Sequence, residues 1–379
     1  MRIGVGIALV LASIVAVVAP AAAKTERVRT IPAKIVSDCT VDVSSQLRGW
    51  IESMPNRTRL KLRRNACYRI DQTISVKDRS HLTLDGNGAT LEADTLGDKD
   101  RRHLTFMGGK DIEVRNLTVQ GANQNAGATK ASYAPARAFQ HAFSFLGVKG
   151  GRLDNVQAYD VYGDFVYIGS FGTPANWSEN ITVKNSRFEG SGRQGISVTA
   201  GKHILIQRNT IGGVGLSMFD LEANTLEGGA IDVRVTHNIT GPAKDFWLAN
   251  KGVGYKIYDI VFDHNKMTAP TGGLVFVYGP KGGYRGPFEF TDNSLITTGL
   301  THDEGSRGAF FFSRASGVTI RDNVVTFPAG KNLPAVESQD SLYVSVDGNT
   351  FTNAGETLLT TKRPETPAAP AAPAAPAAG

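Results

Sequence analysis

The chain has 379 residues, of which 41% are hydrophobic and 20% charged. This composition supplies enough apolar side chains for one large core, and the 42 glycines indicate frequent turns, which favours β structure over helices. The net charge of +6 is small for this length, and no basic run is interleaved with aromatic residues. The sequence therefore argues against a nucleic-acid partner and is compatible with an acidic polymer as ligand.

Residues 1–23 have the pattern of a signal peptide. Arg2 provides a positive start, residues 3–18 are apolar, and small residues at 21–23 fit a cleavage site after Ala23. A membrane anchor is the alternative, but the apolar run is short for a span and is followed by alanines rather than basic residues. We therefore expect a secreted, extracellular protein with no membrane span after cleavage.

Residues 24–75 are predicted to form an N-terminal cap. Leu47, Trp50, Ile51 and Met54 follow the spacing of one helical face, which predicts an amphipathic helix over 43–54. Such a helix would cover the open end of a repeat stack, where strand edges are otherwise unpaired.

The two cysteines, Cys39 and Cys67, fall within this predicted cap. Export to an oxidising compartment predicts a disulfide between them. A metal pair is the weaker alternative, because no short ligand spacing occurs and the nearest histidine is His81. We expect no metal site here.

A degenerate repeat is the strongest signal in the sequence. The pattern apolar-x-apolar-x-x-Asn recurs, with copies that start at residues 181, 204, 233, 260, 288, 318 and 344, so that successive starts differ by 23, 29, 27, 28, 30 and 26 residues. Periods of this size are typical of solenoids or propellers. Because strands and turns but no helical pattern lie between the copies, we predict an all-β fold, a parallel β-helix of about ten coils over residues 76–361. A β-propeller is the alternative, although its blades need a longer period and hairpins.

The repeated Asn has a physical role in this interpretation. It tolerates a left-handed backbone at a turn, and stacked Asn side chains can hydrogen-bond along the axis of the stack. Beyond the repeats, residues 362–379 are rich in Pro and Ala and have too little apolar bulk to pack, which predicts a disordered tail.

Four stretches resemble a known family. They are DGNGATL at 85–91, YGDFVYIG at 162–169, GRQGIS at 192–197 and FDLEAN at 219–224. Together with the cap they resemble secreted right-handed parallel β-helix proteins of the pectate-lyase superfamily, over roughly residues 38–360. The resemblance implies a right-handed coil and a function among polysaccharide lyases, glycoside hydrolases, epimerases, tailspike enzymes and glycan-binding proteins. The polygalacturonase motifs and the calcium cluster of pectate lyases are not recognisable, so neither mechanism carries over.

Five short strands from His141 onward supply the candidate site. Period-two alternation points one residue of each strand outward, where stacked strands would align them. These outward residues are Ser144, Tyr167, Ser197, Asp220 and Trp247.

Carboxylates on neighbouring coils would lie roughly 5 to 10 Å apart, which covers both glycosidase separations. Asp164, Asp220 and Glu222 are therefore the candidate catalytic acid and base or nucleophile, and His141 the candidate that tunes or orients them.

Other side chains on these strands suit substrate binding. In a lyase or epimerase, Lys244, Lys251 or His141 would act as the base, with Arg193 or a Ca²⁺ ion on Asp220 and Glu222 to neutralise a uronate. No cofactor is required, and Ca²⁺ is the one ion that this pattern allows. The predicted substrate-binding residues are Arg193, Gln194, Tyr167, Trp247, Lys244 and Lys251, the two aromatic rings as stacking surfaces for sugars.

Two functions remain open at this point. The first is a secreted enzyme, a lyase, hydrolase or epimerase, that acts on an acidic polysaccharide bound along the coils. The second is a non-catalytic glycan-binding or cell-surface adhesion protein that uses the same face. In both cases we expect a monomer.

Overall fold

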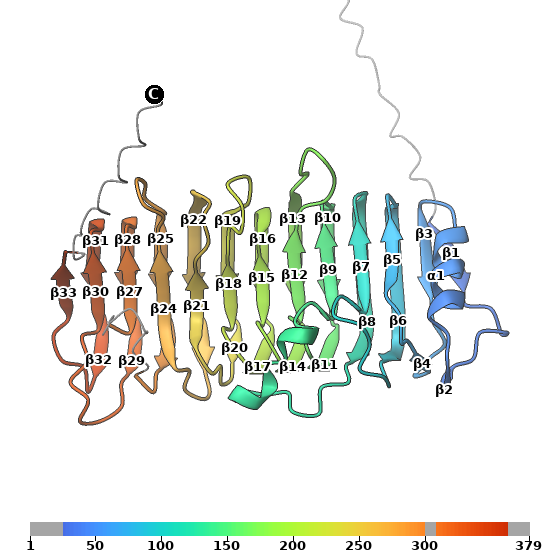
Figure 1. The fold of residues 1–379 in the computed structure, drawn as a ribbon, viewed down its shortest axis with the longest axis horizontal. Coiled ribbons are helices and arrows are strands. Elements are labelled where there is room, and N and C mark those ends of the chain that lie inside the picture. Colours follow the sequence, from blue (N-terminus) through green and yellow to red (C-terminus); the bar gives the residue numbers. More distant parts are fainter. Residues whose placement is uncertain (1–25, 300–307, 363–379) are drawn as a thin grey trace, which may run out of the picture.

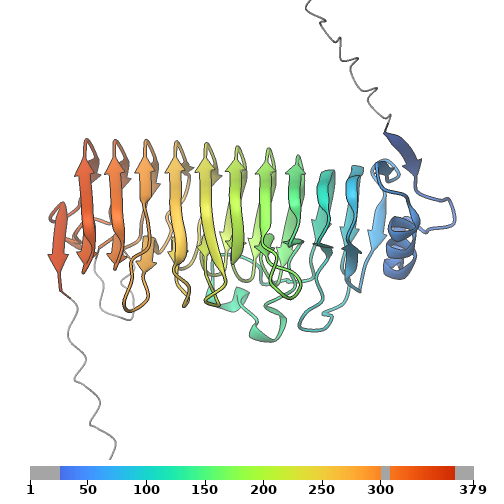
Figure 2. The same ribbon diagram turned by 90° about the horizontal axis from the view of Figure 1, so that it is seen from above.

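A computed structural model of the chain describes residues 26–299 and 308–362. The predicted signal peptide and all but the first residue of the predicted tail lie outside these residues. The chain winds into a row of coils along one long axis, with the N-terminal coils at the blue end and the C-terminal coils at the red end (Figures 1 and 2). No helix in the described part of the chain has the length and apolar character needed to cross a bilayer.

Two parallel sheets form the walls of the row. One has eleven strands, one from each successive coil. These strands are β5 (Ile74–Lys77), β7 (Leu104–Met107), β9 (Phe143–Leu146), β12 (Val166–Gly169), β15 (Ile196–Val198), β18 (Phe219–Leu221), β21 (Phe246–Asn250), β24 (Gly273–Tyr278), β27 (Phe310–Ser313), β30 (Val336–Gln339) and β33 (Leu358–Thr361).

The second sheet has 22 strands and consists of two arms. Its long-strand arm contains β1 (Arg27–Thr30), β3 (Thr58–Lys61), the first halves of β6 (Ser80–Glu92) and β8 (Lys110–Gln120), β10 (Lys149–Asp154), β13 (Ser178–Lys184), β16 (Ala200–Gln207), β19 (Gly229–Thr236), β22 (Lys256–Asp263), β25 (Phe288–Thr291), β28 (Ser316–Arg321) and β31 (Leu342–Asp347). Its short-strand arm contains β2 (Asp38–Asp42), β4 (Cys67–Arg69), the second halves of β6 and β8, β11 (Gln157–Val161), β14 (Arg187–Ser191), β17 (Thr210–Val214), β20 (Ile239–Thr240), β23 (Lys266–Met267), β26 (Ser294–Ile296), β29 (Val324–Thr326) and β32 (Thr350–Thr352).

Each coil therefore contributes three strands, and each strand pairs in parallel with its equivalents in the coils before and after it. This is the predicted right-handed parallel β-helix, and the parallel pairing between coils rules out the β-propeller. Eleven strands in one sheet agree with the expected number of about ten coils.

The core fills the interior of the row. Inward side chains at equal positions on successive coils stack on one another, as in Phe106 on Phe145, with ring centroids 5.5 Å apart, and Phe262 on Phe290 at 5.6 Å. Both spacings are close to the ~4.8 Å between neighbouring strands. Burial of one such ring stabilises the fold by about 1.5–3 kcal/mol, so the aligned columns are a main source of stability.

The N-terminal end of the row is covered as predicted. Helix α1 (Ser44–Ser53) buries Leu47, Trp50 and Ile51 and lies at the blue end of the stack (Figure 1). Cys39 and Cys67 form the predicted disulfide, which ties the segment before the helix to β4.

The predicted asparagine ladder is present at the turn between the two arms. Each Asn side-chain oxygen accepts hydrogen bonds from the backbone N–H and the amide nitrogen of the preceding Asn, with distances of 2.9 to 3.0 Å. The ladder consists of Asn209, Asn238, Asn265, Asn293, Asn323 and Asn349. The expected left-handed backbone occurs one residue earlier, for example at His237 and Asp292, because the Asn itself must point its amide inward.

One long insertion interrupts the regular coils. Residues 121–142 connect β8 to β9 and contain two short 3-10 helices, η1 (Lys130–Ser132) and η2 (Pro135–Arg137). The insertion packs on the coil that contains β14, where the Ser132 hydroxyl donates to the Ser191 carbonyl oxygen at 3.0 Å, and it projects from the stack beside β14 and β17 (Figure 1).

Candidate functional site

The outward column of the 11-stranded sheet collects most of the predicted site. The strand register aligns Ser144, Tyr167, Ser197 and Asp220 on four successive coils, as the alternation predicted. Outward does not mean exposed, because Ser144 and Ser197 are fully buried and Asp220 retains 2% of its surface.

Trp247 does not belong to this column, and the prediction of an outward sugar-stacking tryptophan is wrong. The register pairs Asp220 with Ala249 instead. Trp247 is fully buried in the core, where its ring contacts Phe219 and Phe262 at 6.1 and 4.9 Å. Trp247 and Leu248 are consecutive in β21 and both face inward, so the strict alternation assumed for this strand does not hold.

Asp164 lies at the turn that leads into β12 and is fully buried. One guanidinium nitrogen of Arg193 contacts both carboxylate oxygens, at 3.0 and 2.8 Å, and the backbone N–H of Gln194 donates to the carboxylate at 3.1 Å. Burial raises the pKa of Asp164 while Arg193 opposes this, and Asp164 in turn raises the pKa of the guanidinium. The two residues form a buried, charge-assisted pair.

His141 is fully buried beside this pair, on the preceding coil. The backbone N–H of Asp164 donates to Nδ1 of His141 at 2.9 Å, so Nδ1 carries no proton and the neutral ring carries it on Nε2. Burial, together with Arg193, lowers the pKa of His141 well below its usual value. Although Nδ1 also lies 3.5 Å from a carboxylate oxygen of Asp164, the two do not form an ion pair, because the ring stays neutral.

Tyr167 partly covers this histidine. Its ring stacks on the imidazole of His141, with centroids 4.7 Å apart. The Arg102 guanidinium lies 6.0 Å from the centroid of the same Tyr167 ring. The Tyr167 hydroxyl accepts a hydrogen bond from Thr199 at 3.0 Å. Arg102 carried no signal in the sequence, because it precedes the strand on which the periodic pattern begins.

Gln194 continues the same column of turn residues. Its side-chain oxygen accepts a hydrogen bond from the backbone N–H of Ser217 at 2.6 Å. His141, Asp164 and Gln194 thus each accept from the backbone N–H of the next coil. These three hydrogen bonds link four successive coils beneath the site.

Asp220 and Glu222 bring two carboxyl groups to one face of the sheet. They are two residues apart on one extended segment, so their Cα atoms are about 6.6 Å apart. Oδ2 of Asp220 is buried and has no hydrogen-bond partner among the described residues. Burial raises the pKa of Asp220 well above its usual value, the Glu222 carboxylate raises it further, and Arg193 only partly offsets them. Asp220 is therefore protonated under conditions where an ordinary carboxyl group is ionised.

Glu222 and Arg193 are the accessible parts of this arrangement. Both are partly exposed, whereas Asp220 and Asp164 are buried. A ligand on this face would meet Glu222 and Arg193 first and the protonated Asp220 carboxyl group next to them.

The two predicted lysines lie in different surroundings. The Lys251 ammonium group lies 4.9 Å from the ring centroid of Phe276 and is one of the charges that lower the pKa of Asp220. Lys244 instead pairs with Asp245 at 2.6 Å, at the turn before β21. The structure thus brings Lys251, but not Lys244, into the electrostatic environment of Asp220.

Arg285 is a further residue of this region that the sequence did not reveal. It is 1% exposed and holds the segment after β21 through four hydrogen bonds of 2.6 to 2.9 Å, to the side chain of Asn250 and to the carbonyl oxygens of Lys251, Gly252 and Gly254. Burial lowers the pKa of Arg285 to about 10. Arg285 lies in a loop without repeat character, 34 residues from Lys251, so no periodic signal marked it.

Asp220 and Glu222 do not fit the suggested Ca²⁺ ion. In the described parts of the chain, they do not join a third His, Cys or carboxylate ligand within metal-binding distance. The Arg193 guanidinium already acts on Asp220 as a neighbouring positive charge, whereas Ca²⁺ takes six to eight oxygen ligands.

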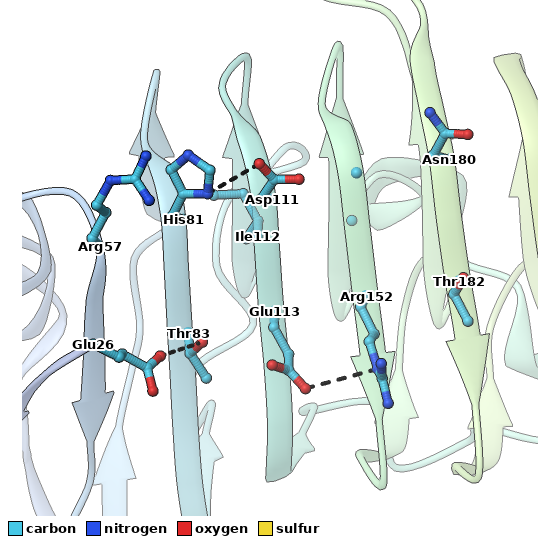
Figure 3. Close-up of a pocket in the computed structure, with 12 residues that line it drawn as sticks. Glu26, Arg57, His81, Thr83, Asp111, Ile112, Glu113, Arg152, Asn180 and Thr182 are labelled. Atoms are coloured by element: carbon cyan, nitrogen blue, oxygen red, sulfur yellow. Dashed lines mark hydrogen bonds and ion pairs between the residues drawn. The ribbon is translucent and has the colours of Figure 1, made fainter. Parts of the chain in front are cut away.

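A second hollow lies on another face. A cavity of about 470 Å³ opens on the long-strand arm near the N-terminal end, lined by charged and hydroxyl side chains from successive strands (Figure 3). Four of its charged or titratable side chains are paired with one another, His81 with Asp111 at 3.1 Å and Arg152 with Glu113 at 3.8 Å. We place the candidate catalytic site at Asp220, because its buried and unpartnered carboxyl oxygen lies close to a second carboxyl group, that of Glu222.

Comparison with solved structures agrees with the fold. The Streptococcus pneumoniae surface protein and adhesin PfbA has a TM-score of 0.57 at 14% identity, over 87% of this chain and 98% of that one. An endo-xylogalacturonan hydrolase from Aspergillus tubingensis has a TM-score of 0.61 at 11% identity, over 88% and 99% of the two chains.

A third similar structure is the tailspike protein of E. coli bacteriophage HK620 in complex with a pentasaccharide, with a TM-score of 0.60 at 12% identity, over 88% of this chain and 61% of that one. No protein-family model and no curated protein sequence matches the chain. The chain thus shares the right-handed parallel β-helix fold of these structures. The adhesin and the hydrolase have the same fold, so the fold alone does not assign a function.

Proposed function

We propose that the protein is a secreted enzyme that hydrolyses a polysaccharide on the outward face of the 11-stranded sheet. The observation that carries this proposal is the buried Asp220, with its raised pKa and unpartnered oxygen, two residues from Glu222 on the same face. A glycoside hydrolase usually has two carboxyl groups in its active site, one of which is kept protonated by its surroundings.

The roles follow from protonation and exposure. Asp220 donates its proton to the glycosidic oxygen as the bond to the anomeric carbon breaks. Glu222, on the accessible side, takes a proton from the water that attacks this carbon. These roles are those of an inverting hydrolase, in which the two carboxyl groups leave room for the attacking water.

Elimination and epimerisation receive less support. Both need an accessible base beside the sugar, and Nδ1 of His141 is buried and accepts the Asp164 backbone N–H. Lys244 is engaged with Asp245. Lys251 is the base candidate near Asp220, and it lies 4.9 Å from the Phe276 ring centroid. Hydrolysis needs only the groups that the site already holds.

Positive side chains indicate an acidic substrate. Arg193 and Lys251 lie in the electrostatic environment of Asp220, and both are partly exposed. Guanidinium groups bind carboxylates in a planar, two-pronged manner, as in uronate recognition. The similar fold of an endo-xylogalacturonan hydrolase adds support, and the disulfide together with the predicted signal peptide supports secretion.

The test is a panel of polyuronates and neutral polysaccharides, read for reducing ends and for absorbance near 235 nm. We expect reducing ends without the absorbance of an unsaturated product. Asp220→Asn and Glu222→Gln should each lower turnover by about 10²-fold or more, the usual contribution of a general acid or base, with binding largely retained. Asp245→Asn, which removes a half-buried carboxylate that pairs with Lys244, is the matched control and should remain active.

A non-catalytic glycan-binding protein is the second candidate. The hollow of about 470 Å³ on the long-strand arm favours it, because its polar lining and size suit a sugar, and the adhesin has the same fold. Binding of a polysaccharide with no reducing ends released, and loss of that binding in Arg152→Ala but not in Asp220→Asn, would establish this function instead.

A further inference from the structure

Two histidines occupy equivalent places on successive coils, away from the carboxyl pair. His237 and His264 are each the first residue of a two-residue turn whose second residue is a ladder asparagine, and both have a left-handed backbone, with φ of 56° and 54°. Their rings are parallel to within 2°, with centroids 4.9 Å apart. The repeat distance of the coil therefore sets the distance between the two imidazoles.

A carboxylate and a hydroxyl group connect these rings. The Thr236 hydroxyl donates to Oδ2 of Asp263 at 3.0 Å and lies 2.6 Å from Nδ1 of His237. Oδ2 of Asp263 lies 3.2 Å from Nδ1 of His264. One ligand atom from each of His237, Asp263 and His264 lies within 4.8 Å of the other two.

The second carboxylate oxygen of Asp263 gives independent evidence for a ligand at this site. Oδ1 is buried and has no hydrogen-bond partner among the described residues, and its nearest opposite charge is Arg234 Nη1 at 3.8 Å. Asp263 is mostly buried, with 16% of its side chain exposed, whereas the side chain of His264 is 52% exposed. The carboxylate is thus a fixed ligand and the imidazoles are adjustable ones.

We propose that His237, Asp263 and His264 bind one late first-row divalent metal ion of the Zn²⁺ class. Two imidazoles and one carboxylate are a usual protein ligand set for Zn²⁺, at about 2.0–2.2 Å from the metal. Imidazole selects Zn²⁺, Ni²⁺ and Cu²⁺ over Mg²⁺ and Ca²⁺, which prefer oxygen ligands. Small rotations of the exposed imidazoles bring both rings onto one ion, and their exposure leaves its remaining coordination position open to water or an external ligand.

The stacked pair has a simpler interpretation as a structural contact between turns. His203 provides the comparison, because it also has a left-handed backbone and pairs with one carboxylate, Asp232, at 2.7 Å, but has no second histidine beside it. A structural role predicts similar behaviour for His203, His237 and His264. A metal site predicts that only the last two affect metal binding.

The experiment is calorimetric titration of the full chain with ZnCl₂, using protein that carries no histidine tag and has been dialysed against a chelator. We expect one Zn²⁺ per chain. His237→Asn and His264→Asn should each weaken binding at least ten-fold, because even changes in the outer shell of a metal site cost about 10–100-fold. Asn is chosen because it tolerates the left-handed backbone.

His203→Asn is the matched control and should bind Zn²⁺ as the unchanged protein does. Melting in the absence of metal, compared among all variants, separates loss of the site from loss of the fold. Failure of the unchanged chain to bind Zn²⁺, equal affinity for Ca²⁺, or full affinity in the doubly substituted His237→Asn, His264→Asn chain with a native melting curve would each overturn the proposal. None of these outcomes depends on the proposed hydrolase activity.

Discussion

Arg193 contacts both carboxylate oxygens of the fully buried Asp164 while 14% of its own side chain remains exposed. The pair therefore connects the interior of the turn before β12 to the outward face. Because burial by itself raises the pKa of Asp164, its charge depends on this one guanidinium group.

Removal of Arg193 should show how far the charge of Asp164 depends on this guanidinium group. Arg193→Met leaves a buried carboxylate uncompensated and should lower the free energy of unfolding by about 3 kcal/mol near neutral pH. The loss should shrink as the pH falls, because protonation of Asp164 removes the buried charge. Denaturant unfolding checks this, with the Arg193→Met, Asp164→Asn double variant as control. Equal losses in the single and double variants would contradict the argument.

Asp220 should make the fold less stable as the pH rises. Its native pKa is raised above the unfolded value, so the native state binds the proton more tightly and stability falls as the pH increases through this range. Asp220→Asn keeps the shape of the protonated group, and should be more stable at pH 8 by about 1–3 kcal/mol, the usual cost of a buried group without its partner. Thermal melting of both chains from pH 4 to 8 is the measurement. Parallel curves would show that Asp220 is ionised in the native state.

His103 should have the opposite effect at acid pH. It is fully buried, with Nδ1 3.0 Å from the His141 carbonyl oxygen, and burial together with Arg101 lowers its pKa from 6.5 to about 3. The unfolded state binds a proton below pH 6.5 that the native state does not, so stability present above this pH is lost as the pH falls towards 3, by about 1.4 kcal/mol for each pH unit.

His103→Gln should flatten this acid dependence, whereas the exposed His203 offers a matched substitution, His203→Gln, that should leave it unchanged. Urea unfolding at pH 4, 5, 6 and 7 gives both slopes. An unchanged slope in the His103 variant would mean that the buried ring is protonated.

The asparagine ladder should be most sensitive at its centre. Asn265 donates to the Val235 carbonyl oxygen and to Asn293 and accepts two hydrogen bonds from Asn238. Asn265→Ala leaves these groups without partners and should cost about 1–3 kcal/mol. Asn349→Ala, at the half-exposed end of the ladder, should cost less, because water can replace the missing partner. Chemical unfolding of both variants tests the order.

The fold was predictable from the sequence because successive coils pack in the same way and therefore need the same pattern of residues. An apolar alternation and an asparagine turn recur at each coil, so that even a degenerate repeat exposes the period. The cap was predictable for a similar reason, since Leu47, Trp50 and Ile51 form one helical face. Alternation failed at Trp247, where two consecutive inward residues shift the phase of β21.

The sequence predicted which side of the sheet the site residues occupy better than it predicted how deeply they are buried and what they contact. Alternation placed Asp220 on the outward side, but only the packed structure shows that its neighbours bury it. The same holds for His141, whose surroundings come from Tyr167, Asp164 and Arg193 on later coils. Arg285 acts on a loop that is 34 residues distant, and no local pattern reports such a contact.

The ladder turn also determines where this fold can change. Between the two arms the connection is two residues long in coil after coil, as at Arg208–Asn209, His237–Asn238 and Asp322–Asn323, because a longer one would break the axial hydrogen bonds. Added segments such as residues 121–142 must therefore enter at the other two corners, which border the 11-stranded sheet. Segments at these two corners can thus change in length and sequence on both sides of the carboxyl pair, and so alter which ligand is bound. The asparagine turn that sets the register of the coils stays unchanged.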